Sequence, residues 1–201
     1  MRAFFSHRIL LPVALGLCLG LGPGSLRASD TVTEVSAIRI TVGDMDRALA
    51  FYTGVLPFRQ VALRAERAQR PAEPGATVQV RIATLELGQE QVELVDWPDP
   101  GGRPIPADSR SFDRWFQHIA IVVSDMDRAY AHLRQHRVKH VSPSPQTLPD
   151  WNPNAGGIRA FYFRDPEDHV LELIWFPEGK GDPRWRRADA RSRGASGPAG
   201  G

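Results

Sequence analysis

Two glutamates stand in apolar, strand-like segments, where an unpaired carboxylate is costly to bury. Glu172 lies in "HVLELIWF", and alternation along a strand puts it on one face with Val170 and Ile174. Glu93 occupies the comparable place in "QVELV". Each carboxylate therefore needs a partner, either a bound cation or a cationic side chain.

Two further side chains are predicted to share a face with these glutamates. His118 opens the segment "HIAIVV" and points away from its isoleucines if those pack beneath a helix. Arg39 lies on the matching face of an earlier segment, where its guanidinium could pair with Glu93 or Glu172. Taken alone, His118 is most simply interpreted as a hydrogen-bonded core histidine.

The elements that must position these side chains occur twice. Sliding the chain by 81 residues places "SAIRITVGDMDRALAFY" over "QHIAIVVSDMDRAYAHL". In both copies an alternating apolar segment predicts a strand, and apolar positions at helical spacing follow it. Asp44 and Asp125 stand between the two and are predicted to cap the helices. The repeated phrase therefore predicts the same strand-to-helix corner in each half.

Turn signals complete two modules, at residues 35–97 and 113–177, with a Pro- and Gly-rich linker at 98–112. Residues 87–89 predict a hairpin between two alternating strands, and residues 165–168 predict a tight reversal in the second half. Each module then consists of a strand, a helix and three strands.

At this point the residues resemble a known family. The pattern H-x-x-x-x-V-x-D at 118–125, the pair "FY" at 51–52 and "DPEDHVLEL" at 165–173 are similar to the vicinal oxygen chelate superfamily. That superfamily includes glyoxalase I, the fosfomycin and bleomycin resistance proteins and the extradiol dioxygenases. The resemblance implies an α+β fold of tandem βαβββ modules, whose curved mixed sheets form a cup.

The resemblance also implies metal positions, which fall on Ala37, Glu93, His118 and Glu172. Three of these can coordinate, and alanine cannot. An imidazole with two carboxylates suits one divalent ion such as Fe, Mn, Zn or Mg. The gap at Ala37 is either an open coordination position or the mark of a site without its metal.

Two functions follow from these alternatives. In the first, a divalent ion polarises a small oxygen-rich substrate, and Glu93 or Glu172 moves a proton, giving an enzyme of lyase, isomerase or dioxygenase type. In the second, the protein binds or sequesters a small molecule without metal, as the resemblance to bleomycin resistance proteins allows. Arg39 would then contact the ligand.

Two long polar segments interrupt the modules. Residues 61–76, with their prolines, are interpreted as an excursion of the chain. In the loop 148–157, Trp151, Asn152 and Asn154 stand among prolines and glycines. These three side chains are candidates for ligand binding from a lid over the cup. The alternative is an ordinary loop held by a buried tryptophan.

Other histidines are weaker candidates for chemistry. His132 and His136 stand four residues apart on the second predicted helix, a spacing that can chelate zinc. Their neighbours are basic and polar, which favours a solvent-exposed face. His169 is opposite in parity to Glu172 and is predicted to miss the cup.

The first 28 of the 201 residues predict a secretory signal peptide. Basic residues precede the apolar stretch 9–21, which is shorter than the roughly 20 residues of a membrane-spanning helix. The only cysteine, Cys18, lies inside this stretch, so the mature chain would have no thiol. We therefore expect a periplasmic or extracellular protein without stable membrane insertion; the alternative is anchoring by the uncleaved segment.

Charge gives little indication of a macromolecular partner. Residues 29–201 carry 22 basic and 23 acidic side chains, a net charge of about −1. The tail 181–201 holds five arginines and two aspartates, and its composition predicts a disordered, solvated segment. We expect a small-molecule substrate or ligand and no nucleic acid, and the sequence leaves a homodimer open.

Overall fold

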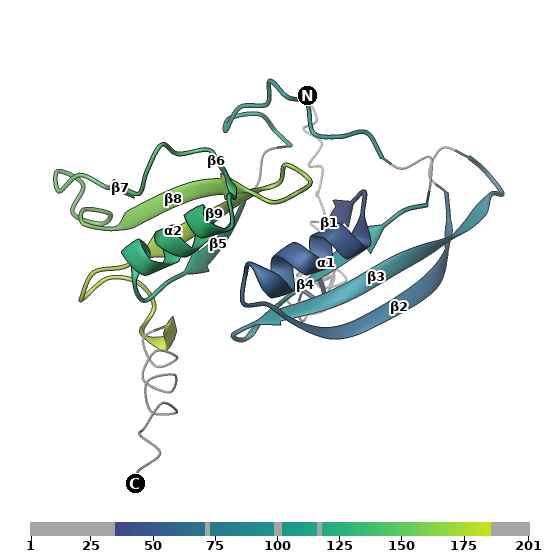
Figure 1. Ribbon diagram of the computed structural model, residues 1–201, viewed down its shortest axis with the longest axis horizontal. Coiled ribbons are helices and arrows are strands. Elements are labelled where there is room, and N and C mark those ends of the chain that lie inside the picture. The colour runs from purple at the N-terminus through teal and green to yellow at the C-terminus, as the bar shows by residue number, and fades with distance from the viewer. Residues whose placement is uncertain (1–34, 71–72, 99–101, 116–117, 186–201) are drawn as a thin grey trace, which may run out of the picture. The chain divides into compact units, whose positions relative to one another are not determined.

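The computed structural model describes residues 35–70, 73–98, 102–115 and 118–185 (Figure 1). The chain divides into two units, Met1–Ser36 and Ala37–Gly201, and every element described below belongs to the second. The predicted signal peptide lies outside the described residues. In the ranges that are described, no helix is long and apolar enough to cross a membrane.

The described residues form two helices and nine strands. In chain order these are β1 (Arg39–Val42), α1 (Met45–Gly54), β2 (Arg59–Gln69), β3 (Thr77–Leu87), β4 (Glu90–Asp96), β5 (His118–Val122), α2 (Met126–Gln135), β6 (Lys139–His140), β7 (Gln146–Thr147), β8 (Arg159–Arg164) and β9 (Val170–Trp175).

The strands form two sheets with the same internal plan. In the first sheet the order is β1-β4-β3-β2, and in the second it is β5-β9-β8-β6, with β7 paired to β8. The first and last strands of each module, β1 with β4 and β5 with β9, are parallel, whereas the other pairs are antiparallel. Figure 1 shows α1 against the first sheet and α2 against the second. The predicted α+β architecture is confirmed.

Both strand-to-helix corners have the predicted caps. Asp44 has φ −143° and ψ 102°, and Asp125 has φ −144° and ψ 104°. The Oδ1 atom of each accepts a hydrogen bond of 3.0 Å from the backbone N–H three residues on, that of Arg47 or Arg128. An aspartate at this position satisfies one of the free amides of the first helical turn.

Alternation along the first strands also holds. Ile40, Val42 and Ile121 are buried in the core beside the helices. Ile38, which precedes Ile40 in the same alternating segment of the sequence, is instead 59% exposed. It lies one residue before β1, so the regular alternation of the strand does not yet fix its direction.

Strand β2 corrects the interpretation of residues 61–76 as an excursion, because it occupies most of that segment. Its burial pattern shows no alternation, since all eleven of its residues are exposed or only partly covered and none is buried. β2 is an edge strand held mainly by its ladder with β3. A strand exposed on both faces carries no hydrophobic period for sequence analysis to detect.

The predicted disordered tail begins in ordered structure. The ring of Trp185 stacks on Phe176, with 5.0 Å between the ring centroids. Residues 186–201, which make up the rest of that prediction, lie outside the described residues.

Candidate functional site

His118 and Glu172 meet on the face of the second sheet that points away from the buried residues of β5. In the parallel ladder of β5 and β9, Ala120 is the partner of Glu172, so His118 and Glu172 share one face. Atom Nε2 of His118 lies 3.1 Å from Oε2 of Glu172. The Glu172 side chain is 7% exposed and that of His118 36%. The expectation that Glu172 needs a partner is confirmed.

Tyr162 completes this group and was missed by sequence analysis. It is the direct partner of Glu172 across the antiparallel ladder of β8 and β9. Its ring lies edge-on to His118, with 5.4 Å between centroids. Burial, and then the charge of Glu172 and a hydrogen bond to it, raise the pKa of Tyr162 to about 12. Five residues separate the paired ends Arg164 and Val170, one more than in the predicted turn at 165–168, so counting back across that turn would have paired Glu172 with Phe161.

Glu93 has different partners, all from its own module. Its Oε2 accepts a 2.7 Å hydrogen bond from Nε of Arg39, and its Oε1 accepts one of 2.7 Å from Nη2 of Arg64. Thr84, opposite Glu93 in the ladder, donates weakly to Oε1 at 3.4 Å. Burial alone raises the pKa of Glu93, but the hydrogen bonds from Arg64 and Arg39 outweigh it and lower the pKa.

The two glutamates are thus equivalent in register and different in chemistry. The predicted pairing of Arg39 with Glu93 is confirmed. Arg64 was missed because it lies on β2, which the sequence did not show as a strand. Sequence analysis had no periodic signal from which to place it.

The predicted convergence of His118, Glu172 and Glu93 on one ion is not found. Both oxygens of Glu93 are taken by guanidinium groups, and Ala37 offers no donor. Within the described ranges, no group of three or more His, Cys, Asp or Glu side chains could hold a metal ion. His118 and Glu172 alone are fewer than the three protein ligands of a catalytic zinc site, so ligation by all three residues stays a prediction and requires Glu93 to leave its arginine partners.

The remaining candidates lie apart from this group. Trp151 is 82% exposed, which excludes the alternative of a loop held by a buried tryptophan. Asn152 accepts a hydrogen bond on Oδ1 from the N–H of Asn154 at 3.2 Å, so it shapes the loop itself. Contact of these three side chains with a ligand stays a prediction.

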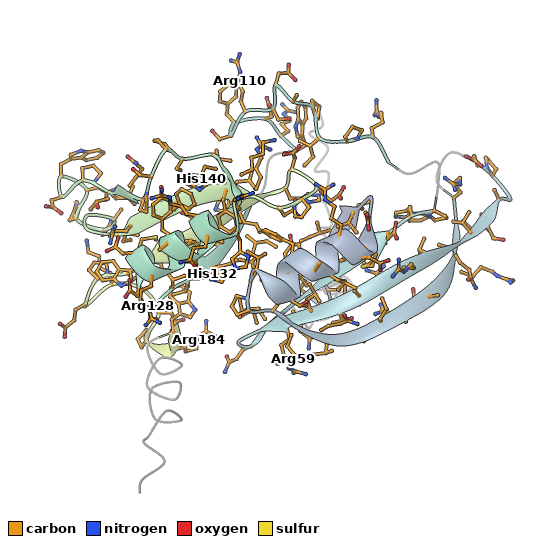
Figure 2. All side chains as sticks on the ribbon, viewed as in Figure 1. Arg59, Arg110, Arg128, His132, His140 and Arg184 are labelled. Atoms are coloured by element: carbon orange, nitrogen blue, oxygen red, sulfur yellow. The ribbon has the colours of Figure 1, made fainter. Side chains whose placement is uncertain are left out.

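The weaker histidines are placed as expected. His132, labelled in Figure 2, and His136 are exposed on α2. Atom Nε2 of His132 lies 2.8 Å from the carbonyl oxygen of Val55. His169 lies in the β8–β9 turn, where its Nδ1 is 2.8 Å from Oδ2 of Asp165.

The repeated βαβββ plan and the paired histidine and glutamate at its parallel strands define a class of protein. The chain belongs to the glyoxalase/bleomycin resistance protein/dioxygenase superfamily, whose sequence profile matches residues 34–173. The family resemblance drawn from the sequence is therefore confirmed. Members of this superfamily bind small molecules, commonly bind a divalent metal ion and are often dimers.

Two protein sequences that are similar to it are an epimerase and a protein of Escherichia coli. A 2-epi-5-epi-valiolone epimerase from an Actinomyces species is 34% identical over 152 residues, which cover 72% of this chain and 80% of that protein. The uncharacterized protein YaeR of Escherichia coli K12 is 33% identical over 147 residues, covering 70% of this chain and 94% of the other.

Solved structures agree on the fold. A glyoxalase family protein from Bacillus cereus matches with a TM-score of 0.59 at 17% identity, over 75% of this chain and 98% of that one. A domain of the same superfamily from Frankia matches with a TM-score of 0.51 at 19% identity, over 73% and 100%. At this level of identity they show the fold alone.

Proposed function

We propose that the protein is an isomerase of epimerase type, in which a proton next to a carbonyl group of a small oxygen-rich molecule is removed from one face and a proton from water is added to the opposite face. The observation that carries the proposal is the contact between His118 and Glu172 on an open sheet face. The similarity to an epimerase supports the same reaction type.

His118 is the group proposed to transfer the proton. Its imidazole is the more exposed member of the pair, so a substrate on the sheet face can reach it. Glu172 is a positioning residue, because its side chain is almost fully covered and its Oε2 faces the ring nitrogen. A carboxylate so placed fixes the orientation of the imidazole toward the substrate.

Tyr162 is proposed to act as a hydrogen-bond donor. A pKa raised to about 12 keeps its hydroxyl protonated at neutral pH. That single O–H donates to Glu172, so Tyr162 helps to fix the carboxylate that positions His118. No step in this scheme needs Glu93.

The test compares variants in an epimerase assay with 2-epi-5-epi-valiolone and other polyhydroxylated ketones. His118→Gln and Glu172→Gln should each lower kcat/KM by roughly 10²- to 10⁴-fold, the usual contribution of a positioned acid or base. His136→Gln, which changes an exposed histidine of α2, is the matched control and should retain the wild-type rate. Equal activity in all three variants would remove the basis of the proposal.

A metal-dependent enzyme is the competing proposal. Superfamily membership favours a metal-dependent reaction. The family resemblance implies that His118, Glu172 and Glu93 would bind one Fe, Mn, Zn or Mg ion. For Glu93 to take part, it would have to leave Arg39 and Arg64. The binding or sequestration module is the third alternative, and it predicts ligand binding without turnover in the same assay.

We propose in addition that the chain is exported and processed near Ser29. Support comes from the basic and apolar pattern of residues 1–28 and from the absence of cysteine after Cys18. Assembly into a homodimer is likewise a proposal, because members of the superfamily are often dimers.

A further inference from the structure

The corner that joins β1 to α1 already binds a carboxylate. The backbone N–H of Gly43 donates to Oε2 of Glu167 at 3.2 Å, and Nη1 of Arg47 lies 3.9 Å from Oε1 of the same side chain. A Cβ atom at Gly43 would lie 3.1 Å from that Oε2, so the carboxylate rests directly against the corner. A carboxylate is thus bound here by one backbone amide and one arginine side chain, which are four residues apart in the sequence.

The corner that joins β5 to α2 carries the same pair. The 81-residue repeat puts Ser124 in the place of Gly43 and Arg128 in the place of Arg47. The two N-caps have the same backbone conformation, within a few degrees, so the amide and the arginine start from the same geometry.

Among the described residues, no carboxylate from another element is bound at this second corner. Glu167 lies in the turn between β8 and β9, and the corresponding β3–β4 turn holds Gly88 and Gln89, neither of which is charged. In the part of the chain that the structure describes, the guanidinium of Arg128 makes no ion pair or hydrogen bond; only its backbone N–H does, with Asp125.

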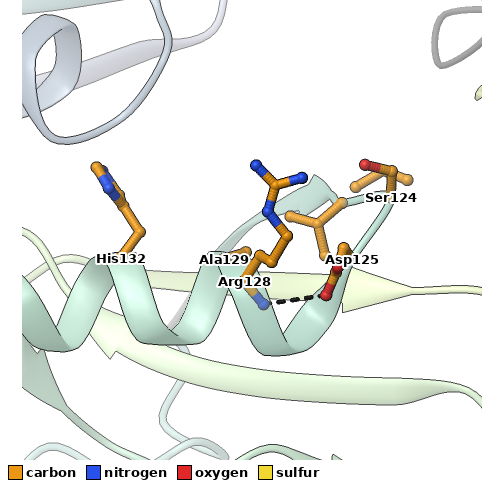
Figure 3. A pocket seen from close by; sticks show the side chains of 7 residues that line it. Ser124, Asp125, Arg128, Ala129 and His132 are labelled. Carbon is orange, nitrogen blue, oxygen red and sulfur yellow. Dashed lines mark hydrogen bonds between the residues drawn. The ribbon is translucent and has the colours of Figure 1, made fainter. Parts of the chain in front are cut away.

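An open surface hollow of about 460 Å³, called the cavity below, lies where the missing carboxylate would bind. Figure 3 shows the side chains of Ser124, Arg128 and His132 pointing to the same side of α2, into this space. The lining is Val122, Val123, Ser124, Asp125, Arg128, Ala129 and His132. None of these belongs to the group of His118, Glu172 and Tyr162, and the volume is within the range of small-ligand pockets.

We infer that this cavity is a binding site for a small carboxylic acid. The carboxylate accepts from the N–H of Ser124 and pairs with the guanidinium of Arg128, as Glu167 does with Gly43 and Arg47. The remaining volume takes the carbon skeleton against Ala129 and the ring of His132, which is held in place by its contact with the Val55 carbonyl.

The acidic residue at the rim does not prevent this. Asp125 is already engaged as the helix cap. Its counterpart Asp44 makes the same cap at the first corner, and Glu167 binds there nonetheless. A guanidinium and an aligned amide outweigh one capped carboxylate nearby.

The test follows the backbone amides of the ¹⁵N-labelled full-length chain by NMR during titration with sodium succinate, at constant ionic strength. The Ser124 amide should shift in a saturable way in wild-type protein. Arg128→Gln should weaken that binding by roughly tenfold or more, the usual effect of losing a charged hydrogen-bond donor. Arg134→Gln, on an exposed part of the same helix, should leave the affinity unchanged.

A second variant tests the equivalence of the corners and does not depend on Arg128. Glu167→Ala empties the first corner, so the Gly43 amide should now respond to succinate as well as Ser124. A response of Gly43 without one of Ser124 would overturn the inference. So would tighter binding of inorganic phosphate than of succinate, because the site would then be for phosphate rather than carboxylate.

Discussion

Glu93 and Glu172 occupy equivalent strand positions but do different work because their neighbours differ. Glu172 faces an imidazole and a phenol, whereas Glu93 faces two guanidinium groups. An arginine partner holds a carboxylate ionised and occupied, while a histidine partner leaves a group that can exchange protons. The second module therefore carries the acid–base chemistry in our proposal.

Metal removal distinguishes the proposed metal-free proton transfer by His118 from a metal-dependent reaction. Because no proposed step passes through a metal, treatment with EDTA followed by desalting should leave the epimerase rate unchanged. Elemental analysis of protein purified without chelator is the companion measurement. A stoichiometric divalent ion, with activity lost on chelation and restored by Mn, Fe, Zn or Mg, would instead support ligation by His118, Glu172 and Glu93.

For single residues, the directions of side chains on regular strands could be predicted from the sequence. Sequence analysis put His118 and Glu172 on one face and Arg39 beside Glu93, because side-chain direction along a strand has a period of two. It could not place Arg64, whose strand has no apolar face. The family resemblance implied that Glu93 is a metal ligand; its two arginine partners could be seen only in three dimensions, and metal ligation by Glu93 stays a prediction.

At the scale of elements, the β8–β9 turn is organised by one carboxylate. Asp165 is buried, and its Oδ1 accepts from the N–H groups of Glu167 and His169 at 2.8 and 2.9 Å. Its Oδ2 accepts from the hydroxyl of Tyr52 at 3.0 Å and faces the His169 ring. The motif "DPEDH" is therefore a preformed turn tied to helix α1.

The pH dependence of stability should report on this turn. Burial lowers the pKa of His169, but the hydrogen bond and charge of Asp165, helped by Glu167 and Asp168, outweigh it and raise the pKa above 6.5. A raised pKa in the folded state adds stability that is fully present below the unfolded pKa and is lost as the pH rises through the folded pKa.

We therefore expect the free energy of unfolding to fall as the pH rises from just below 6.5 through the folded pKa of His169. Denaturant titrations at a series of pH values measure it. His169→Gln should flatten the profile in this window, and the exposed-site variant His136→Gln should not. A profile unchanged by His169→Gln would contradict the account.

Some elements could be predicted from local sequence patterns and others could not. The turns at 87–89 and 165–168 were predicted correctly because Gly, Pro and Asp fix local backbone geometry. Strand β2 and the exposure of Trp151 were not, because both depend on what the rest of the chain leaves uncovered.

At the scale of the whole molecule, the two modules share one hydrophobic core. The cluster of buried residues takes Tyr52 and Leu94 from the first module and Met126 and Phe161 from the second. The buried apolar residues of each module pack against those of the other, so we regard the tandem modules as a single folding unit.

The proposed export is also a property of the whole chain. Mass spectrometry of the mature protein should find an N-terminus near Ser29, because the segment before it has the pattern of a cleaved signal peptide. Cell fractionation supplies the control. Intact Met1 on soluble cytosolic protein would contradict export.

Proton transfer by His118 can be followed by hydrogen isotope exchange in the substrate. Wild-type protein is incubated with 2-epi-5-epi-valiolone in D₂O, and deuterium at the carbons next to the carbonyl is followed by NMR and mass spectrometry. The account predicts catalysed deuterium incorporation that falls by roughly 10²-fold or more in His118→Gln. Incorporation that is no faster with wild-type protein than without it, for this ketone and for the related polyhydroxylated ketones, would contradict the account.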